Sequence, residues 1–122
     1  MKKRFTLGAV AYCPEVVTIW DGFKSWFQEH AFPFDTILYT NYETQVEAHF
    51  AGQIDVAWNS PLAWIQSERV ARQRGFEASA IAMRDTDQDL ASVVVVRTDS
   101  GIDCVGDLRK KVVGVGAHDS PQ

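Results

Sequence analysis

The order of hydrophobic and polar positions predicts short strands that are each followed by a helix. Three apolar runs have the length of buried strands: 5–10, 34–40 and 54–58. Three longer segments carry apolar side chains at close to helical spacing: 14–29, 42–51 and 61–74. Pro14 and Pro61 stand near helix starts, and Gly75 follows the last helix, as the preferences at helix ends favour. We therefore expect three consecutive strand–helix units.

After residue 75 the pattern changes from helices to strands. Residues 78–83 and 90–97 are predicted strands separated by a polar turn, and positions 93–96 are all valine, which is typical of a strand buried on both faces. A short helix is expected over 105–111 and a last strand over 112–116. Alternating strands and helices favour an α/β fold, with a mostly parallel sheet covered by helices on both faces.

Composition and charge narrow the class of partner. The chain has 122 residues, of which 46% are hydrophobic and 23% charged, so one domain with an ordinary globular core is expected. Its net charge of −4 argues against a general binder of nucleic acid or of anionic membranes. A local anion site remains compatible with this charge, because helix dipoles and backbone amides supply positive potential.

The first residues are interpreted as the start of the mature fold. Residues 2–4 are basic, as at the start of a signal peptide, but the apolar run after them is short and Pro14 interrupts it. We therefore expect residues 5–10 to form the first strand. No run approaches the roughly 18 apolar residues of a membrane span.

The cysteines and histidines give no sign of a metal or cofactor. Cys13 and Cys104 are too few for a disulfide framework, and the three histidines are isolated from one another. We expect no metal, no cofactor and no nucleotide-binding glycine motif.

Three segments carry a resemblance to a known superfamily. Segment 50–64, F-A-G-Q-I-D-V-A-W-N-S-P-L-A-W, is similar to the G-x-x-D-x-(A/G)-x-x-(G/S)-P turn of type 2 periplasmic binding proteins. Segment 90–101 resembles the crossover strand that runs into R-x-D-S-G-I in the same proteins, and segment 107–116 is similar to their D-L-(R/K)-G-K-x-V-(G/A). Within the superfamily the chain looks most like the phosphate, phosphite and phosphonate group of ABC-transporter substrate-binding proteins.

The resemblance implies the organisation and the partners. It implies a first lobe over residues 1–98, with 99–122 as the crossover and the start of a second lobe that the chain carries only in part. It implies a small oxyanion or phosphonate as ligand, a membrane permease as partner, no chemistry, and a periplasmic location, although no convincing signal peptide is visible. An isolated lobe would expose an apolar face, so we expect a homodimer or exchange of the C-terminal segment.

Candidate ligand-binding residues follow the predicted strands, because ligands of parallel α/β sheets bind outside the carboxyl ends of the strands. Tyr12 follows the first strand, where its phenol would donate to a phosphoryl oxygen or pack against an organic substituent of the ligand. The alternative is a partly buried surface tyrosine. Asn59 and Ser60 follow the third strand. Ser60 is either an N-cap alone or an N-cap that also contacts ligand at a helix N-terminus.

A second candidate group follows the last predicted strand: His118, Asp119, Ser120 and Gln122. The resemblance implies that this segment supplies hydroxyl and backbone N–H donors from the second lobe, a role that Ser120 fits. Asp119 would repel a dianion, so it would accept the proton of a monoprotonated ligand or only cap a helix. A capped helix start without ligand remains the alternative. Arg84 would bind a phosphoryl oxygen through its fork, or remain a solvated surface arginine.

Two other uses of the chain stay open. A ligand-binding domain of the same fold would serve a cytoplasmic sensor or regulator. An enzyme would use Cys13 as nucleophile, although no base is placed near it in sequence. Trp58 and Trp64 are interpreted as core or cleft wall.

Overall fold

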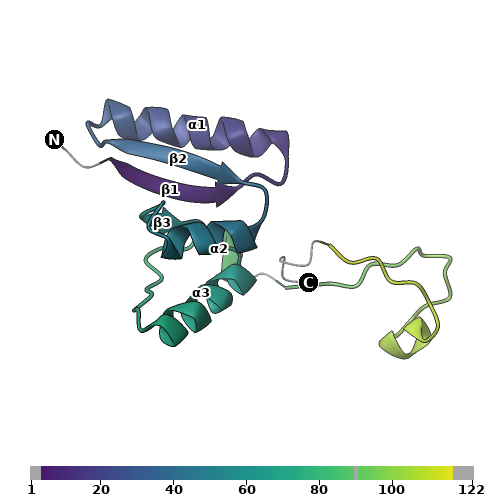
Figure 1. Ribbon diagram of the computed structural model, residues 1–122. Helices are drawn as coiled ribbons and strands as arrows, with labels where there is room; N and C mark the ends of the chain where they lie inside the picture. Colours follow the sequence, from purple (N-terminus) through teal and green to yellow (C-terminus); the bar gives the residue numbers. More distant parts are fainter. Residues whose placement is uncertain (1–3, 90, 117–122) are drawn as a thin grey trace.

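The computed structural model describes residues 4–89 and 91–116. Strands and helices alternate through its first part: β1 (Phe5–Val10), α1 (Pro14–Glu29), β2 (Phe34–Tyr39), α2 (Tyr42–Phe50), β3 (Val56–Ala57) and α3 (Pro61–Arg74). Two short 3-10 turns follow, η1 (Asp85–Asp87) and η2 (Val105–Leu108). Figure 1 shows the strands and helices gathered in one body, from which the later part of the chain extends.

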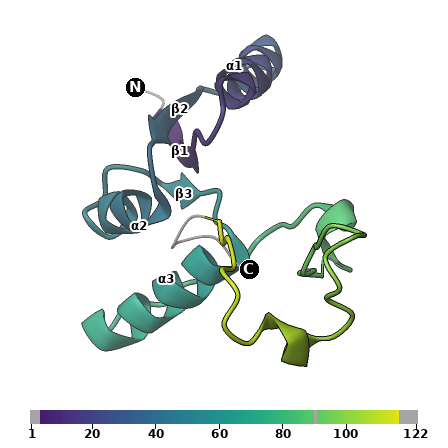
Figure 2. The same ribbon diagram turned by 90° about the vertical axis from the view of Figure 1, so that its right-hand side faces the viewer.

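The described strands form one parallel sheet in the order β2-β1-β3. In its register Phe5 lies opposite Phe34, and Leu7 lies opposite Val56. The chain passes from β1 to β2 on one side of it, and then crosses back to β3 on the other side of β1. Because such crossovers are right-handed, α1 and α2 cover opposite faces of the sheet, as Figure 2 shows. The predicted α/β class, with a parallel sheet between helices, is confirmed.

One cluster of the core lies between the sheet and α1. It is formed by buried apolar side chains from β1, α1 and β2: Leu7, Ala9, Val16, Trp20 and Phe34. Aromatic rings extend it, since Phe27 packs on Phe34 with ring centroids 4.6 Å apart. Other apolar side chains of α1 are partly exposed, among them Phe23 and Trp26.

Gly8 lets the segment before β3 approach the centre of the sheet. A Cβ atom at this position would lie 2.4 Å from Cδ1 of Ile54 and 3.1 Å from Cε2 of Tyr39. Both distances are shorter than ordinary van der Waals contacts, so a side chain at position 8 would force the side chains of Ile54 and Tyr39 to shift. The glycine is therefore favoured by packing rather than by its backbone angles.

The helix ends follow the local sequence signals closely. The predicted bounds of α1 and α3 are confirmed, and α3 ends at Gly75, whose φ of +72° is the left-handed value that glycine adopts most easily. The third strand is shorter than predicted. Outside Val56–Ala57 the pairing with β1 continues as isolated bonds, in which Asp55 N donates to Thr6 O and Trp58 N donates to Gly8 O, each at 2.8 Å.

The strand predictions beyond α3 are wrong for the residues that the structure describes. Segments 78–83, 91–97 and 112–116 are irregular there, and the predicted helix over 105–111 is the 3-10 turn η2. Val95 is 84% exposed and Val112 is fully exposed. A valine run forms a strand only where a neighbouring strand accepts its hydrogen bonds, and here these segments run outside the sheet (Figure 1). Leu90 lies outside the described residues.

Candidate functional site

Three helix N-termini meet the carboxyl ends of the three strands. The chain passes from β1 into α1 through Tyr12 and Cys13, from β2 into α2 through Asn41, and from β3 into α3 through Asn59 and Ser60. Free backbone N–H groups and the positive ends of the helix dipoles therefore point toward one edge of the sheet. This strand-end edge favours a negatively charged ligand.

Ser60 is the N-cap of α3. Its Oγ accepts a hydrogen bond from Ala63 N at 3.2 Å, and Pro61 occupies the first turn, as predicted from the Ser-Pro pair. Such a cap contributes about 1 kcal/mol. In this role the Ser60 hydroxyl oxygen is an acceptor. The predicted ligand contact of Ser60 stays a prediction.

Asn59 belongs to a buried hydrogen-bond network. Gln45, which is fully buried on α2, donates from Nε2 to Trp58 O at 3.0 Å and to Asn59 Oδ1 at 2.8 Å. Asn59 Nδ2 in turn donates to Ser67 Oγ at 3.3 Å, and Ser67 Oγ donates to Ala63 O at 2.9 Å. This network joins α2, the turn after β3 and α3, so the Asn59 side chain holds the turn in place. No pattern in the sequence indicates this role of Asn59.

Aromatic side chains surround the strand-end edge. Tyr12 is 77% exposed, as expected for a residue at the rim of a site. Trp58 follows β3 and packs edge-on against Trp20, with ring centroids 5.9 Å apart. Tyr42 is the first residue of α2 and was not among the predicted site residues. The capping residue Asn41, whose Oδ1 accepts from Thr44 N at 2.8 Å, was the sequence signal for this helix start.

The guanidinium group of Arg84 lies over the ring of Trp58. Its guanidinium carbon is 5.9 Å from the centroid of the Trp58 ring, which is within cation–π range. The hydrogen bonds that Arg84 donates to Asp87, and then the charge of Asp87, raise the pKa of Arg84, and Tyr12 and Tyr42 add smaller contributions in the same direction. Tyr12 and Arg84, which the sequence singled out separately, thus lie within electrostatic range of each other, and so does Tyr42.

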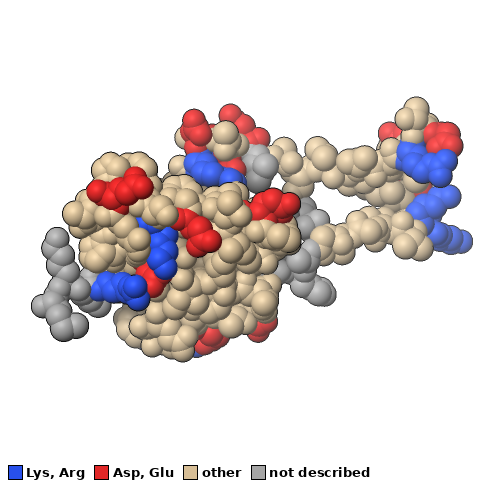
Figure 3. Space-filling view, turned by 90° about the horizontal axis from the view of Figure 1, so that it is seen from above, with Lys and Arg blue, Asp and Glu red and all other residues tan. Residues whose placement is uncertain are grey.

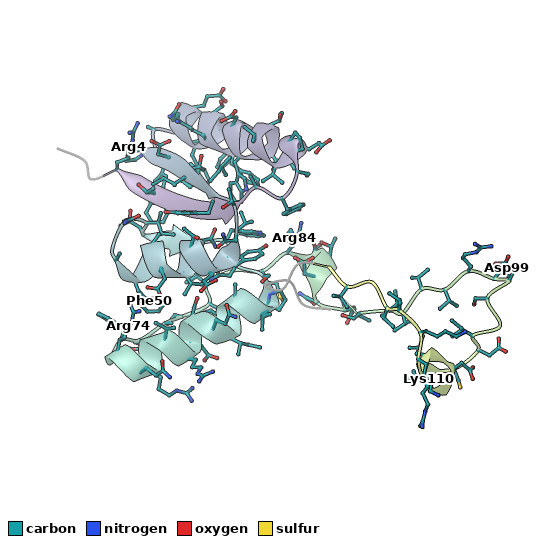
Figure 4. The ribbon with its side chains drawn as sticks, turned by 45° about the vertical axis from the view of Figure 1, so that its right-hand side comes forward. Arg4, Phe50, Arg74, Arg84, Asp99 and Lys110 are labelled. Atoms are coloured by element: carbon teal, nitrogen blue, oxygen red, sulfur yellow. The ribbon has the colours of Figure 1, made fainter. Side chains whose placement is uncertain are left out.

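The opposite edge of the lobe carries a separate set of charges. Arg4 and Lys24 pair with Asp35 at 2.9 and 2.7 Å, and Arg74 pairs with Glu47 at 3.2 Å. Figure 4 shows Arg4 and Arg74 on the side of the body away from Arg84, and Asp99 and Lys110 at the far end of the extended segment. Basic side chains gather at that far end in Figure 3 as well. Arg84 is therefore the described cation that the fold places beside Trp58.

Cys13 has a local partner. Its thiol hydrogen bonds with Glu15, and this contact, followed by the backbone amide of Glu15, lowers the pKa of the Glu15 carboxyl group. A carboxylate at the first turn of α1 also suits the helix dipole. The geometry gives Cys13 a part in the start of the helix and supplies no feature specific to a nucleophile.

Other surface features of the described residues lie away from the strand-end edge. A depression of about 360 Å³ on α3 and one of about 260 Å³ beside α2 are not lined by Tyr12, Trp58 or Arg84. In residues 4–89 and 91–116, no group of three or more metal-ligating side chains gathers. None of the described helices is long and apolar enough to cross a membrane. The predicted residues His118, Asp119, Ser120 and Gln122 lie outside the described residues.

The fold and its strand-end edge together define a class of protein. This class is an α/β lobe in which three helix N-termini are directed at one end of a parallel sheet. The comparison with family models gives the particular group. A model described as "ABC transporter, phosphonate, periplasmic substrate-binding protein" matches residues 12–122, and the chain belongs to this family. No curated protein and no solved structure was found to match the chain. The resemblance seen in the three sequence segments is thereby confirmed.

Proposed function

We propose that this chain captures phosphate, phosphite or a phosphonate at its strand-end edge and presents the ligand, chemically unchanged, to a membrane permease. The family is one of phosphonate-type substrate-binding proteins of ABC transporters, whose partner is such a permease. The observation that carries the proposal is the convergence of three helix N-termini beside Tyr12 and Ser60. Amides and hydroxyls that point at one place bind an oxyanion without a reaction step.

The proposal divides the chain into two parts. Residues 1–98 would form the first lobe, and 99–122 would lead into the second, which adds His118, Asp119, Ser120 and Gln122 to the ligand contacts. The exposure of the valines at 93–95 and 112 supports a cover of further protein over both parts of this segment. A second copy of the chain would cover it equally well, so the homodimer stays a prediction.

Calorimetry tests the ligand class. Titration with phosphate, phosphite and methylphosphonate should give binding heat with at least one of them. Tyr12→Phe should then weaken binding by about two- to tenfold, because one hydrogen bond to the ligand is lost. Tyr39→Phe is the matched control, since the Tyr39 hydroxyl is buried without a hydrogen-bond partner in the described part of the chain. Absence of heat with all three ligands would overturn the assignment.

A further inference from the structure

Arg84 is held by an internal carboxylate in the geometry that guanidinium groups use for oxyanions. Its Nε donates to Asp87 Oδ2 at 2.7 Å, and its Nη2 donates to Asp87 Oδ1 at 2.9 Å. Two parallel N–H···O bonds of this kind are made equally well to a carboxylate, a phosphate or a phosphonate. The Arg84 fork is thus formed and directed, and Asp87 occupies it.

The pair stands at the strand-end edge rather than on an unrelated surface. Arg84 lies over Trp58, the first residue after β3, and Trp58 is itself held by Trp20 of the core. In Figure 4 Arg84 lies where the extended segment joins the body. The aromatic platform holds the guanidinium at this edge independently of its carboxylate partner.

We propose that Arg84 is a ligand-binding residue of this edge, and that Asp87 occupies its fork until a phosphoryl or phosphonyl group replaces the carboxylate. This inference rests on the proposed function and assigns the residue that recognises the anionic head of the ligand. The exchange of Asp87 for a ligand requires little free energy, because the ion pair is solvated. The side chains of Arg84 and Asp87 are 61% and 26% exposed. Exposed pairs contribute little stability, whereas a ligand in the fork also meets the helix N-termini.

The competing interpretation is a local surface pair. Arg84 and Asp87 are three residues apart around the turn η1, and such neighbours often pair for local reasons alone. The two interpretations differ in what removal of Asp87 does. A local pair predicts a looser turn and no gain in ligand affinity, whereas an occupied binding fork predicts tighter binding.

The test is calorimetry of the whole chain and its variants with phosphite and methylphosphonate. Arg84→Gln should weaken binding about tenfold or more. The affinity of Arg84→Lys should lie between those of Arg84→Gln and the parent chain, because lysine keeps the charge and lacks the fork. Asp87→Asn should tighten binding by about threefold. Asp85→Asn is the matched control, since it makes the same change of charge in the same turn. The Asp85 carboxylate accepts a hydrogen bond from Thr86 N at 2.8 Å, whereas the Arg84 fork is occupied by Asp87. We expect its affinity to remain within about twofold of the parent.

Each outcome bears on the proposal. Ligand binding that is unchanged in Arg84→Gln would overturn the role of Arg84 and leave the proposed function standing. Equal gains in Asp87→Asn and Asp85→Asn would indicate general charge and contradict the fork exchange. If the parent chain binds neither probe, the proposed function and this inference fail together. A gain of affinity in Asp87→Asn is not produced by misfolding, so it supports the proposal even if the Arg84 variants fold poorly.

Discussion

Trp20→Ala is expected to lower the free energy of unfolding by about 3–5 kcal/mol, the cost of removing a large buried aromatic side chain. Trp20 is only 9% exposed and belongs to the core between α1 and the sheet. Its ring also lies 5.2 Å from Phe23 and 5.9 Å from Trp58, measured between centroids. Its loss therefore leaves a cavity under the strand-end edge as well as in the core.

Trp26→Ala on the same helix is the matched control. Trp26 is 53% exposed and stacks mainly on His30, at a centroid distance of 4.0 Å. We expect it to cost no more than about 1 kcal/mol, as is usual for surface positions. Urea unfolding followed by circular dichroism measures both variants. Equal losses at the two positions would contradict the assignment of the core.

Gln45→Leu is expected to lower the free energy of unfolding by about 2 kcal/mol, even though it places an apolar group in a buried site. The amide of Gln45 is the hydrogen-bond donor to Trp58 O and Asn59 Oδ1, and both acceptors lose it in the variant. Part of this cost is offset, because Gln45 Oε1 is itself buried without a hydrogen-bond partner among the described residues. The turn after β3 should loosen in consequence.

Hydrogen exchange separates this local effect from a general loss of stability. In Gln45→Leu the amides of Trp58 and Trp64, which donate to Gly8 O and Ser60 O, should exchange faster than those of α1. Gln53→Leu, at an exposed position shortly after α2, should change neither stability nor exchange there. A Gln45→Leu chain as stable as the parent would show that the network does not hold the turn.

Local signals predicted the first 75 residues well. The ends of α1 and α3 depend on Pro14, the Ser60-Pro61 pair and Gly75, and each acts within one turn of its own position. The strands predicted at 78–83, 90–97 and 112–116 failed in the described residues for the opposite reason. Their valines favour a strand, but the sheet ladder must come from residues distant in the sequence, and the three-stranded sheet does not extend to them.

The candidate site stays a prediction, and only part of its geometry could be expected from the sequence. The rule that ligands bind at strand ends singled out Tyr12 and Ser60 from sequence alone. The fixing of Asn59 by Gln45 and Ser67 depends on how α2 and α3 pack, which no spacing in the chain reveals. The position of Arg84 over Trp58 likewise arises only when the segment after α3 returns to the strand-end edge.

Amide chemical-shift mapping of the labelled chain with methylphosphonate shows whether the strand-end edge is the ligand site. We expect the largest shifts on the three turns at residues 11–16, 41–44 and 58–63, together with the Arg84 side chain. NMR detects weak binding, so the test does not depend on high affinity. Shifts centred on the depression of α3 lined by Ile65, Arg69 and Arg72, or no shifts at any ligand concentration, would contradict it.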